Sequence, residues 1–199
     1  MIGGVTASPQ SRTMSERVVA AAAELTCEVG WAGVTMAKLA DRVGVSRQTV
    51  YNEMGSKPAL AEAMVLRELA TFLAAVDRAF DRHPDDLVDA IGAAVTDVLV
   101  EAESNALLQA VVSSAYGAES DLLPLLTTES DALVDTAKQV VAARLAGYEV
   151  GVDAKHLGAA IDMVVRTVLS HVIHPSGRPE DTAEGIAWLA GRALRSTAG

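Results

Sequence analysis

A group of polar side chains between residues 47 and 52 has the chemistry needed to bind DNA. Arg47 and Gln48 stand in the first turn of a short predicted helix. There Arg can form two hydrogen bonds with guanine, and Gln two with adenine. Thr49 and Tyr51 carry hydroxyl groups that suit phosphate oxygens. The pattern predicts that this segment contacts both base edges and the phosphate backbone.

Two short helices joined by a tight turn would position these side chains. The first is expected from about Thr35 to Val43, with apolar residues at helical spacing. Gly44 can end it in a left-handed conformation. Ser46 is a good N-cap for the second helix, from Arg47 to about Asn52. This is the layout of a helix-turn-helix, in which the second helix enters the major groove.

The same stretch closely resembles the DNA-binding region of the tetracycline-repressor (TetR) family of bacterial regulators. The resemblance spans about Met14 to Leu66. Its turn, core, Tyr and Lys residues match together in order, in the segments Gly33-Val34-Thr35, Leu39-Ala40, Val43-Gly44-Val45-Ser46, Thr49-Val50-Tyr51 and Ser56-Lys57. It implies DNA contacts at Thr35, Lys38, Arg47, Gln48, Thr49, Tyr51, Asn52 and Lys57.

One pair of residues departs from the family pattern. Asn52-Glu53 stands where an aromatic residue and a His are frequent. Phosphate would repel Glu53 unless the carboxylate accepts a hydrogen bond from cytosine or pairs with an Arg. We expect Glu53 to be solvated or to form an ion pair within the protein.

Lys57 stands at the expected start of the fourth helix, after the N-cap Ser56. A cation at a helix N-terminus opposes the helix dipole. The conflict disappears if a phosphate binds there, because the helix amides and the ammonium group would both hold it. We therefore expect Lys57 to contact the DNA backbone. Trp31 is expected to be a core residue rather than a platform for a base.

The composition predicts an all-α protein. Half of the 199 residues are hydrophobic, while only two Phe, two Trp and three Tyr occur. Alanine-rich, proline-poor sequence favours helices, and no strand-like alternation of useful length is present. We expect a disordered arm at residues 1–13, a three-helix helix-turn-helix domain at 14–57, and a larger helical domain at 58–199. About nine helices are expected in all.

The net charge of −10 at first argues against a DNA-binding protein, but the charge is unevenly distributed. Residues 12–57 hold six basic and five acidic residues, a net charge of +1. Residues 58–199 hold ten basic and 21 acidic residues, a net charge of −11. Only the first segment can approach phosphates without strong repulsion. We expect few phosphate contacts and modest non-specific affinity for DNA.

Other features of the sequence point to a cytoplasmic protein without membrane contact. Residues 1–11 lack the charge and the apolar run of a secretory signal. The longest uncharged run, Ser104 to Ala118, is too short and too polar to span a membrane. The single cysteine, Cys27, rules out an internal disulfide. It is expected to be a small buried residue of the first helix rather than a redox sensor.

For the larger domain, the resemblance implies a ligand pocket among the fourth to eighth helices. Its walls would consist mainly of Ala, Val and Leu, which suits an apolar or amphipathic small molecule. The uncharged run supplies hydrogen-bonding side chains that are candidates to orient such a ligand. These candidates are Asn105, Gln109, Ser113, Ser114 and Tyr116.

Two helices near the C-terminus, about Ala154 to Ile173 and Glu180 to Arg195, carry apolar stripes. Asp162 and Arg166 are spaced to form an ion pair on the first helix. The resembling family dimerises through a four-helix interface of this kind. The alternative is that both stripes face the protein's own core. The expected interface residues are Leu157, Ala160, Ile161, Val164, Val168, Ile186, Ala190 and Leu194.

Two other classes of protein stay open. A helical enzyme would need a catalytic constellation, and none is visible. His171 and His174 are spaced to share a metal, but no HExxH motif or Cys cluster accompanies them, so we expect neither metal nor cofactor. A small-molecule or lipid carrier with a vestigial DNA-binding domain is the second alternative. The sequence favours a dimeric, ligand-responsive regulator, most simply a repressor of a palindromic operator, over both.

Overall fold

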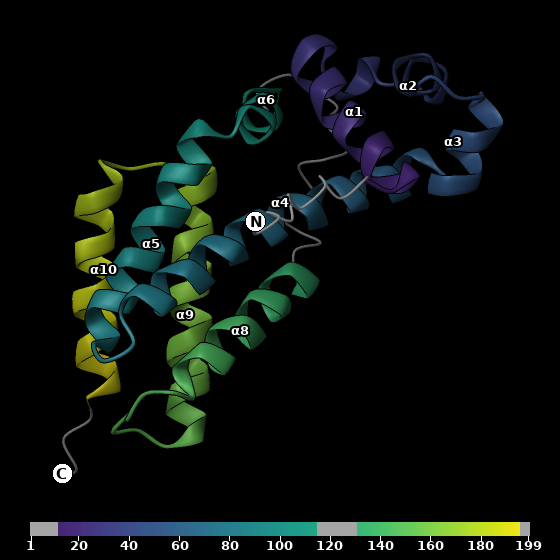
Figure 1. The fold of residues 1–199 in the computed structure, drawn as a ribbon. Coiled ribbons are helices and arrows are strands. Elements are labelled where there is room, and N and C mark those ends of the chain that lie inside the picture. Colours follow the sequence, from purple (N-terminus) through teal and green to yellow (C-terminus); the bar gives the residue numbers. More distant parts are fainter. Residues whose placement is uncertain (1–11, 115–130, 196–199) are drawn as a thin grey trace, which may run out of the picture. The chain divides into compact units, whose positions relative to one another are not determined.

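The computed structural model describes residues 12–114 and 131–195 (Figure 1). Within these ranges the chain forms nine α-helices and one short 3-10 helix, and no strand. The predicted all-α fold is confirmed. The chain divides into two compact units, which we call the head (residues up to Met64) and the body (Val65 onward). The division lies inside the fourth helix, whereas the sequence suggested a domain boundary at its start.

The head contains α1 (Met14–Val29), the 3-10 helix η1 (Trp31–Gly33), α2 (Met36–Val43), α3 (Arg47–Met54) and the first turns of α4 (Lys57–Arg82). A hydroxyl group begins each α-helix. Thr13, Thr35, Ser46 and Ser56 accept hydrogen bonds from backbone amides of the first turns. Gly44 has φ +76° and ψ +39°, the left-handed conformation expected at the end of α2.

The arm expected at residues 1–13 is only partly within the described residues. Residues 1–11 lie outside them. Thr13 belongs to the fold, because its hydroxyl accepts from the Glu16 amide (3.2 Å) while the Glu16 carboxylate accepts from the Thr13 amide (2.7 Å). This reciprocal capping box fixes the start of α1 at Met14.

A small apolar core holds the head together. It includes the side chains of Val18, Ala22, Leu25, Trp31, Leu39 and Val50, all buried. Trp31 is thus a core residue, as expected from the sequence. Cys27 is exposed, so the expectation that it is buried was wrong. The core-facing positions of that turn of α1 are taken by Leu25 and Thr26, and the Thr26 hydroxyl donates to the Ala22 carbonyl oxygen (2.7 Å).

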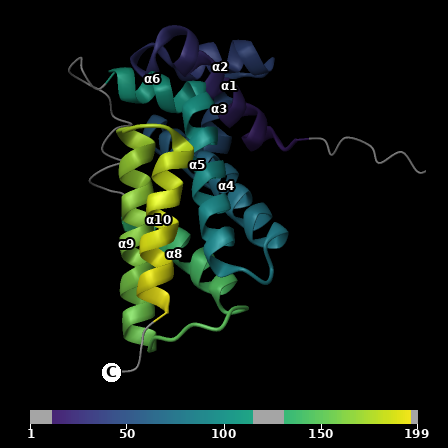
Figure 2. The same cartoon turned by 90° about the vertical axis from the view of Figure 1, so that its left-hand side faces the viewer.

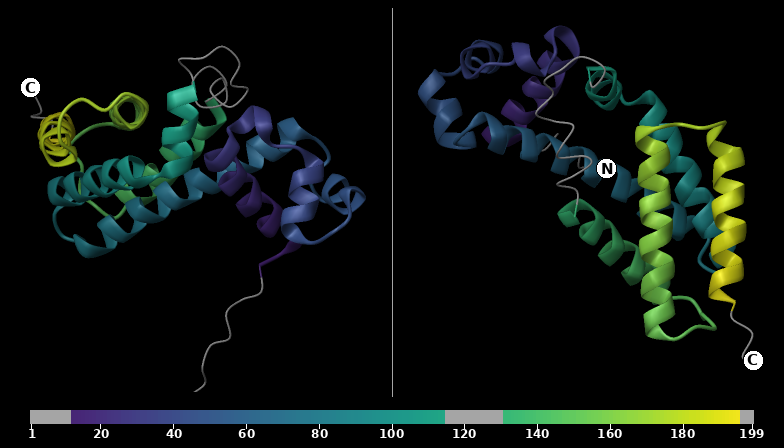
Figure 3. Two further views of the ribbon diagram at one scale, coloured as in Figure 1. Left: turned by 90° about the horizontal axis from the view of Figure 1, so that it is seen from above. Right: turned by 180° about the vertical axis from the view of Figure 1, so that it is seen from behind.

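The body contains the rest of α4 together with α5 (Leu87–Ser104), α6 (Ala106–Ser114), α8 (Asp131–Leu145), α9 (Ala154–Ile173) and α10 (Pro179–Leu194). Helix α9 begins and ends at the predicted residues. Residues 115–130, which precede α8, lie outside the described residues. Helices α9 and α10 lie side by side, with α5 packed against α10 (Figures 2 and 3).

The α5–α10 contact is close because small residues face it. A Cβ on Gly191 would lie 2.7 Å from a methyl carbon of Val88, and one on Gly92 would lie 3.5 Å from the Ala187 Cβ. Ion pairs join other helices. Arg144 of α8 contacts Asp77 (2.6 Å) and Asp81 (2.7 Å) of α4. These contacts raise the pKa of the Arg144 guanidinium, chiefly through the hydrogen bond to Asp77.

The predicted pair between Asp162 and Arg166 is present at 3.0 Å. Asp162 also forms an ion pair with Lys138 of α8 (3.0 Å), which the sequence did not suggest. The hydrogen bond from Lys138, followed by that from Arg166, holds the pKa of the Asp162 carboxyl below its ordinary value. Asp162 therefore links α8 to α9 as well as stabilising its own helix.

Candidate nucleic-acid interface and effector cavity

Helix α3 is anchored by one face and exposes the other. Val50 and Met54 are buried against the head core. The Ser46 hydroxyl accepts from the Thr49 amide (3.0 Å) and lies 2.9 Å from the Thr49 hydroxyl. This anchoring leaves four of the predicted DNA contacts of α3 exposed and Thr49 half-buried. The exposed ones are Arg47, Gln48, Tyr51 and Asn52.

These exposed side chains form two pairs, each one helical turn apart. The Arg47 guanidinium donates to the Tyr51 hydroxyl (3.3 Å) and lies 5.4 Å from the centre of the Tyr51 ring. The Gln48 side-chain amide donates to the Asn52 side-chain oxygen (2.9 Å). Both pairs hold hydrogen-bonding groups on the outer face of α3, where base edges can compete for them. Glu53 is also exposed, and it forms no ion pair with any described residue.

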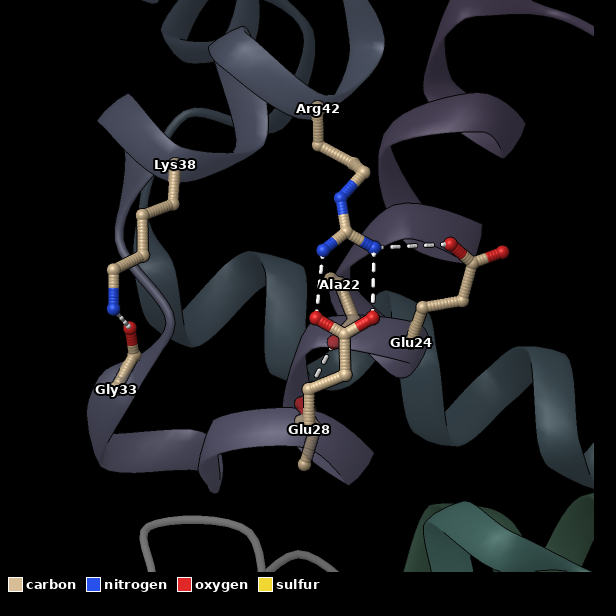
Figure 4. A network of polar contacts seen from close by, with 7 residues as sticks. Ala22, Glu24, Glu28, Gly33, Lys38 and Arg42 are labelled. Atoms are coloured by element: carbon tan, nitrogen blue, oxygen red, sulfur yellow. Dashed lines mark hydrogen bonds and ion pairs between the residues drawn. The ribbon is translucent and has the colours of Figure 1, made fainter.

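Two further predicted DNA contacts already have roles within the head. The Thr35 hydroxyl caps α2 by accepting from the Lys38 amide (3.2 Å). The Lys38 ammonium donates to the Gly33 carbonyl oxygen (2.8 Å), as Figure 4 shows. Both side chains are exposed, so a phosphate could bind to them in addition to or in place of these partners.

The side chain of Arg42, one turn after Lys38 on α2, contacts α1 instead. Its guanidinium contacts the Glu28 carboxylate through two nitrogens (3.0 and 2.6 Å) and also reaches Glu24 (3.4 Å) (Figure 4). The hydrogen bond from Arg42 holds the pKa of Glu28 below its ordinary value. Two carboxylates thus neutralise this cation, and the clamp joins α1 to α2.

Lys57 is half-buried and has a partner that the sequence did not reveal. Its ammonium donates to the Trp31 carbonyl oxygen (2.9 Å) and lies 4.7 Å from the centre of the Trp31 ring. A carbonyl oxygen and an aromatic face both stabilise a cation. This contact accounts for a Lys at the start of α4 without a phosphate, so the phosphate contact stays a prediction.

The body holds a cavity of about 190 Å³ lined by residues of α4, α5, α6, α8 and α9. The described lining is apolar at every position except Glu68. It includes Phe72 and Phe80 of α4, Val98 of α5, Val134 of α8 and Val168 of α9. An apolar cavity of about 150 Å³ can already hold benzene, so this one can hold a small apolar molecule.

The polar residues expected to line the pocket do not do so where the structure describes their side chains. Gln109 is exposed, and Asn105 lies outside the lining. Ser113 and Ser114 are the last residues of α6, and Tyr116 lies outside the described residues. Helix α6 turns Leu107, Leu108 and Val111 to the cavity, and Gln109 is exposed to solvent.

Asn105 does approach the cavity indirectly. Its side-chain nitrogen donates to the Glu68 carboxylate (2.5 Å), and its side-chain oxygen accepts from the Leu108 amide (2.8 Å). Sequence reasoning missed Glu68, because one charged residue in a long amphipathic helix has the pattern of a solvated position. Glu68 reaches the cavity wall because this face of α4 lines the cavity, and Asn105 at the start of α6 hydrogen-bonds to it.

The residues expected at the dimer interface divide into a buried group and a half-buried group. Ile161, Ile186, Ala190 and Leu194 are buried in the core of the body. Leu157, Ala160, Val164 and Val168 are half-buried against that core, and the two valines also line the cavity. Within one subunit the apolar stripes pack on the core of the body, and the dimer interface expected from the sequence stays a prediction.

The outer faces of the same two helices expose other large apolar side chains. Met163 of α9 is 66% exposed, and Trp188 and Leu189 of α10 are each 60% exposed. The Arg192 guanidinium lies 5.7 Å from the centre of the Trp188 ring. A shallow depression beside these residues is lined by Ala159, Met163, Trp188 and Arg192, among others. A Trp and a Leu outside the apolar stripe were the signal that could have indicated this surface.

Two remaining features of the body give no sign of another site. His171 Nδ1 lies 2.8 Å from the Thr167 carbonyl oxygen, and the described residues contain no cluster of three potential metal ligands. Helix α9 is long and apolar enough to cross a membrane by length and composition alone. One such helix is weak evidence for a membrane span, and α9 contacts α5, α8 and α10 of the body.

Comparisons with known proteins cover both units. Residues 18–64 match the family described as bacterial regulatory proteins, tetR family, and residues 86–192 match the bacterial tetracyclin repressor C-terminal domain. Over 176 residues the chain is 26% identical to the HTH-type transcriptional regulator AlkX of Mycobacterium tuberculosis (strain ATCC 25618 / H37Rv), which covers 88% of this chain and 82% of that protein.

Solved structures show the same likeness. The TetR family repressor AlkX from Dietzia sp. strain DQ12-45-1b, implicated in biodegradation of n-alkanes, has a TM-score of 0.72 and 27% identity, covering 88% of this chain and 94% of that chain. RolR in complex with resorcinol has a TM-score of 0.61 at 14% identity, covering 90% of each chain, and shares the fold.

Proposed function

Because this chain belongs to the TetR family of bacterial transcriptional regulators, we propose that it is a repressor that binds a palindromic operator as a homodimer and is released by an apolar or amphipathic small molecule. As a member of that family it is a DNA-binding regulator and not an enzyme. Like other such regulators, it would act in the cytoplasm.

The observation that carries the proposal is the exposed face of α3. A short helix, capped by Ser46 and anchored by Val50, presents Arg47 and Gln48 from its first turn. In a helix-turn-helix these positions reach base edges in the major groove. The Tyr51 hydroxyl and the Lys57 ammonium are suited to phosphates.

For the dimer, we assign the contact to the outer faces of α9 and α10 rather than to their stripes. Trp188, Met163 and Leu189 are large, apolar and exposed, and Trp is enriched among the residues that dominate binding energy. A dimer of this kind needs operator half-sites about 34–36 Å apart, one for each recognition helix.

For the effector, the apolar cavity of the body supports a hydrocarbon-like molecule. The Dietzia relative, which is implicated in n-alkane biodegradation, points to the same chemistry. Helix α4 supplies residues to both units, so we propose that it transmits cavity occupancy to the head. By reciprocity, operator DNA must weaken effector binding by the factor by which the effector weakens DNA binding. Equal effector affinity with and without operator would contradict this coupling.

The DNA-binding proposal is tested by selecting bound duplexes from a random pool. We expect enrichment of a palindrome whose half-sites are one helical turn apart or a multiple of it. Arg47→Ala should then cost about 1–3 kcal/mol and relax discrimination at one or two base pairs. The control is Arg78→Ala, which removes an equal charge from an exposed position in the body. Loss of affinity without loss of discrimination in Arg47→Ala would remove its base-reading role.

A further inference from the structure

The cavity wall has one charged side chain among its described residues. Glu68 of α4 is half-buried and lies among apolar lining residues such as Leu69 and Leu108. Its apolar neighbours offer no competing hydrogen-bonding side chains, so a polar group that enters the cavity meets this carboxylate. Glu68 is therefore placed to decide which polar group an effector can bring into the cavity.

Asn105 fixes the position of this carboxylate. The Asn105 side-chain oxygen caps α6 by accepting from the Leu108 amide, so its nitrogen points to Glu68 Oε2 (2.5 Å). Glu68 Oε1 has no hydrogen-bond partner in the described part of the chain. An ionised carboxylate only accepts hydrogen bonds, so the free oxygen offers an acceptor and a negative charge.

We propose that Glu68 selects the effector's polar end: the cavity takes an apolar chain or ring that ends in a hydrogen-bond donor, a hydroxyl or a protonated amine, and rejects one that ends in a carboxylate. A donor satisfies Glu68 Oε1, and an ammonium group also neutralises its charge. An effector carboxylate close to Glu68 is repelled by it. Such a carboxylate can donate a hydrogen bond to Glu68 only if it is first protonated. Asn105 is a positioning residue that acts through Glu68. The proposal rests on the proposed role of the cavity as the effector site.

The test on the unaltered protein is calorimetric titration at pH 7 with 1-octanol, octylammonium and octanoate, which share one alkyl chain and differ only in the polar end. We expect 1-octanol and octylammonium to bind more tightly than octanoate by on the order of tenfold or more, because a desolvated like-charge pair is costly. Equal or tighter binding of octanoate would overturn the selection by Glu68 and leave the cavity standing as the effector site. Failure of all three to bind, with operator binding intact, would overturn the effector site itself.

Two variants should move the selectivity in opposite directions. Glu68→Gln removes the charge, so octanoate should gain on the order of tenfold relative to octylammonium. Asn105→Asp keeps an oxygen for the α6 cap but adds a carboxylate beside Glu68, so octylammonium should gain relative to 1-octanol. The control is Glu62→Gln, which removes the same charge from an exposed position on the same helix and should leave all three affinities unchanged. If each variant changed the affinities for all three molecules by the same factor, Glu68 and Asn105 would have a structural role only and would not select the polar end.

Discussion

The head and the body are both all-helical, but different kinds of information determine them. In the head, each α-helix begins at a Thr or Ser cap, and Gly30, Gly44 and Gly55 follow the ends of α1, α2 and α3 with positive φ. These signals act within a few residues of the chain. In the body, the contacts that place the helices join residues far apart in sequence, such as Arg144 with Asp77 and Arg82 with Asp97. Local signals can be found in a sequence, whereas the choice among distant partners cannot.

From Arg17 to Lys57 every basic residue of the head has a partner within the head. Arg17 donates to the Val43 carbonyl oxygen (2.8 Å), Lys38 and Lys57 donate to carbonyl oxygens, Arg42 pairs with carboxylates, and Arg47 pairs with Tyr51. DNA must therefore compete with these partners, in keeping with the modest affinity expected from a net charge near zero.

The largest expected effect tests whether the two units are also separate in stability. Leu39 is fully buried in the head core, and Leu39→Ala should lower the head's free energy of unfolding by about 2–5 kcal/mol. Operator binding should be lost while binding in the body cavity persists. Native-state hydrogen exchange would measure both units in one experiment, with Leu66→Ala, at a 48% exposed position, as the control. An equal loss of protection in α5 and α10 would show that head and body unfold together.

The next test separates the two faces of α9. Met163→Asp puts a charge on the exposed outer face, and Trp188→Ala removes the largest exposed side chain of α10. Each should weaken the dimer by about 2 kcal/mol or more if these side chains dominate the contact. Val164→Asp instead puts a charge in the cavity wall and should lower thermal stability before it dissociates the dimer.

Sedimentation at several concentrations would measure the association, and melting curves the stability. Val100→Asp is the matched control, because Val100 is 45% exposed on α5 and does not line the depression beside Met163 and Trp188. If Val164→Asp gave monomers without a change in melting temperature, the dimer interface would lie on the apolar stripe that the sequence predicted.

How far the sequence leads follows from particular residues. Ser46, Gly44 and Val50 predict the helix-turn-helix because each acts on its own neighbours. The stripe of α9 predicts that one face is covered, but it does not say that Ile161 packs in the core or that Val168 lines the cavity. The same periodic pattern is compatible with packing in the core, with lining the cavity and with contacting a second subunit. Glu68 and the Lys57–Trp31 contact were missed because each depends on residues that only the folded chain brings together.

Two glycines offer a sharper test of local against distant information. Gly44→Ala should cost about 1–2 kcal/mol, because its φ of +76° strains any Cβ, although nothing lies within 4 Å of that position. Gly191→Ala should cost about 1–3 kcal/mol for the opposite reason, since the new methyl group would lie 2.7 Å from Val88.

The rescues distinguish the two causes. Gly44→Asn should retain more stability than Gly44→Ala, because Asn tolerates the left-handed conformation. Val88→Ala should recover part of the stability lost in Gly191→Ala by making room for the methyl group. Denaturant unfolding of the single and double variants gives the coupling energy. If Gly191→Ala and Val88→Ala were simply additive, close packing would not be the reason for Gly191.

The smallest expected effect concerns Lys57. Its position at the start of α4 predicts a phosphate contact, whereas the folded chain gives its ammonium group a contact with Trp31. Lys57→Met keeps the apolar stem and removes the ammonium group that contacts Trp31. We expect the head to lose about 1 kcal/mol of stability, because a hydrogen bond and a cation–π contact disappear. If the ammonium group also binds a phosphate, the slope of log K for DNA against log salt concentration should fall by about 0.9 for each subunit. Binding curves at several salt concentrations measure that slope independently of stability, and Lys155→Met, an exposed Lys of α9, is the control. A loss of head stability at an unchanged slope would mean that Lys57 serves Trp31 alone, and the phosphate contact would then be withdrawn.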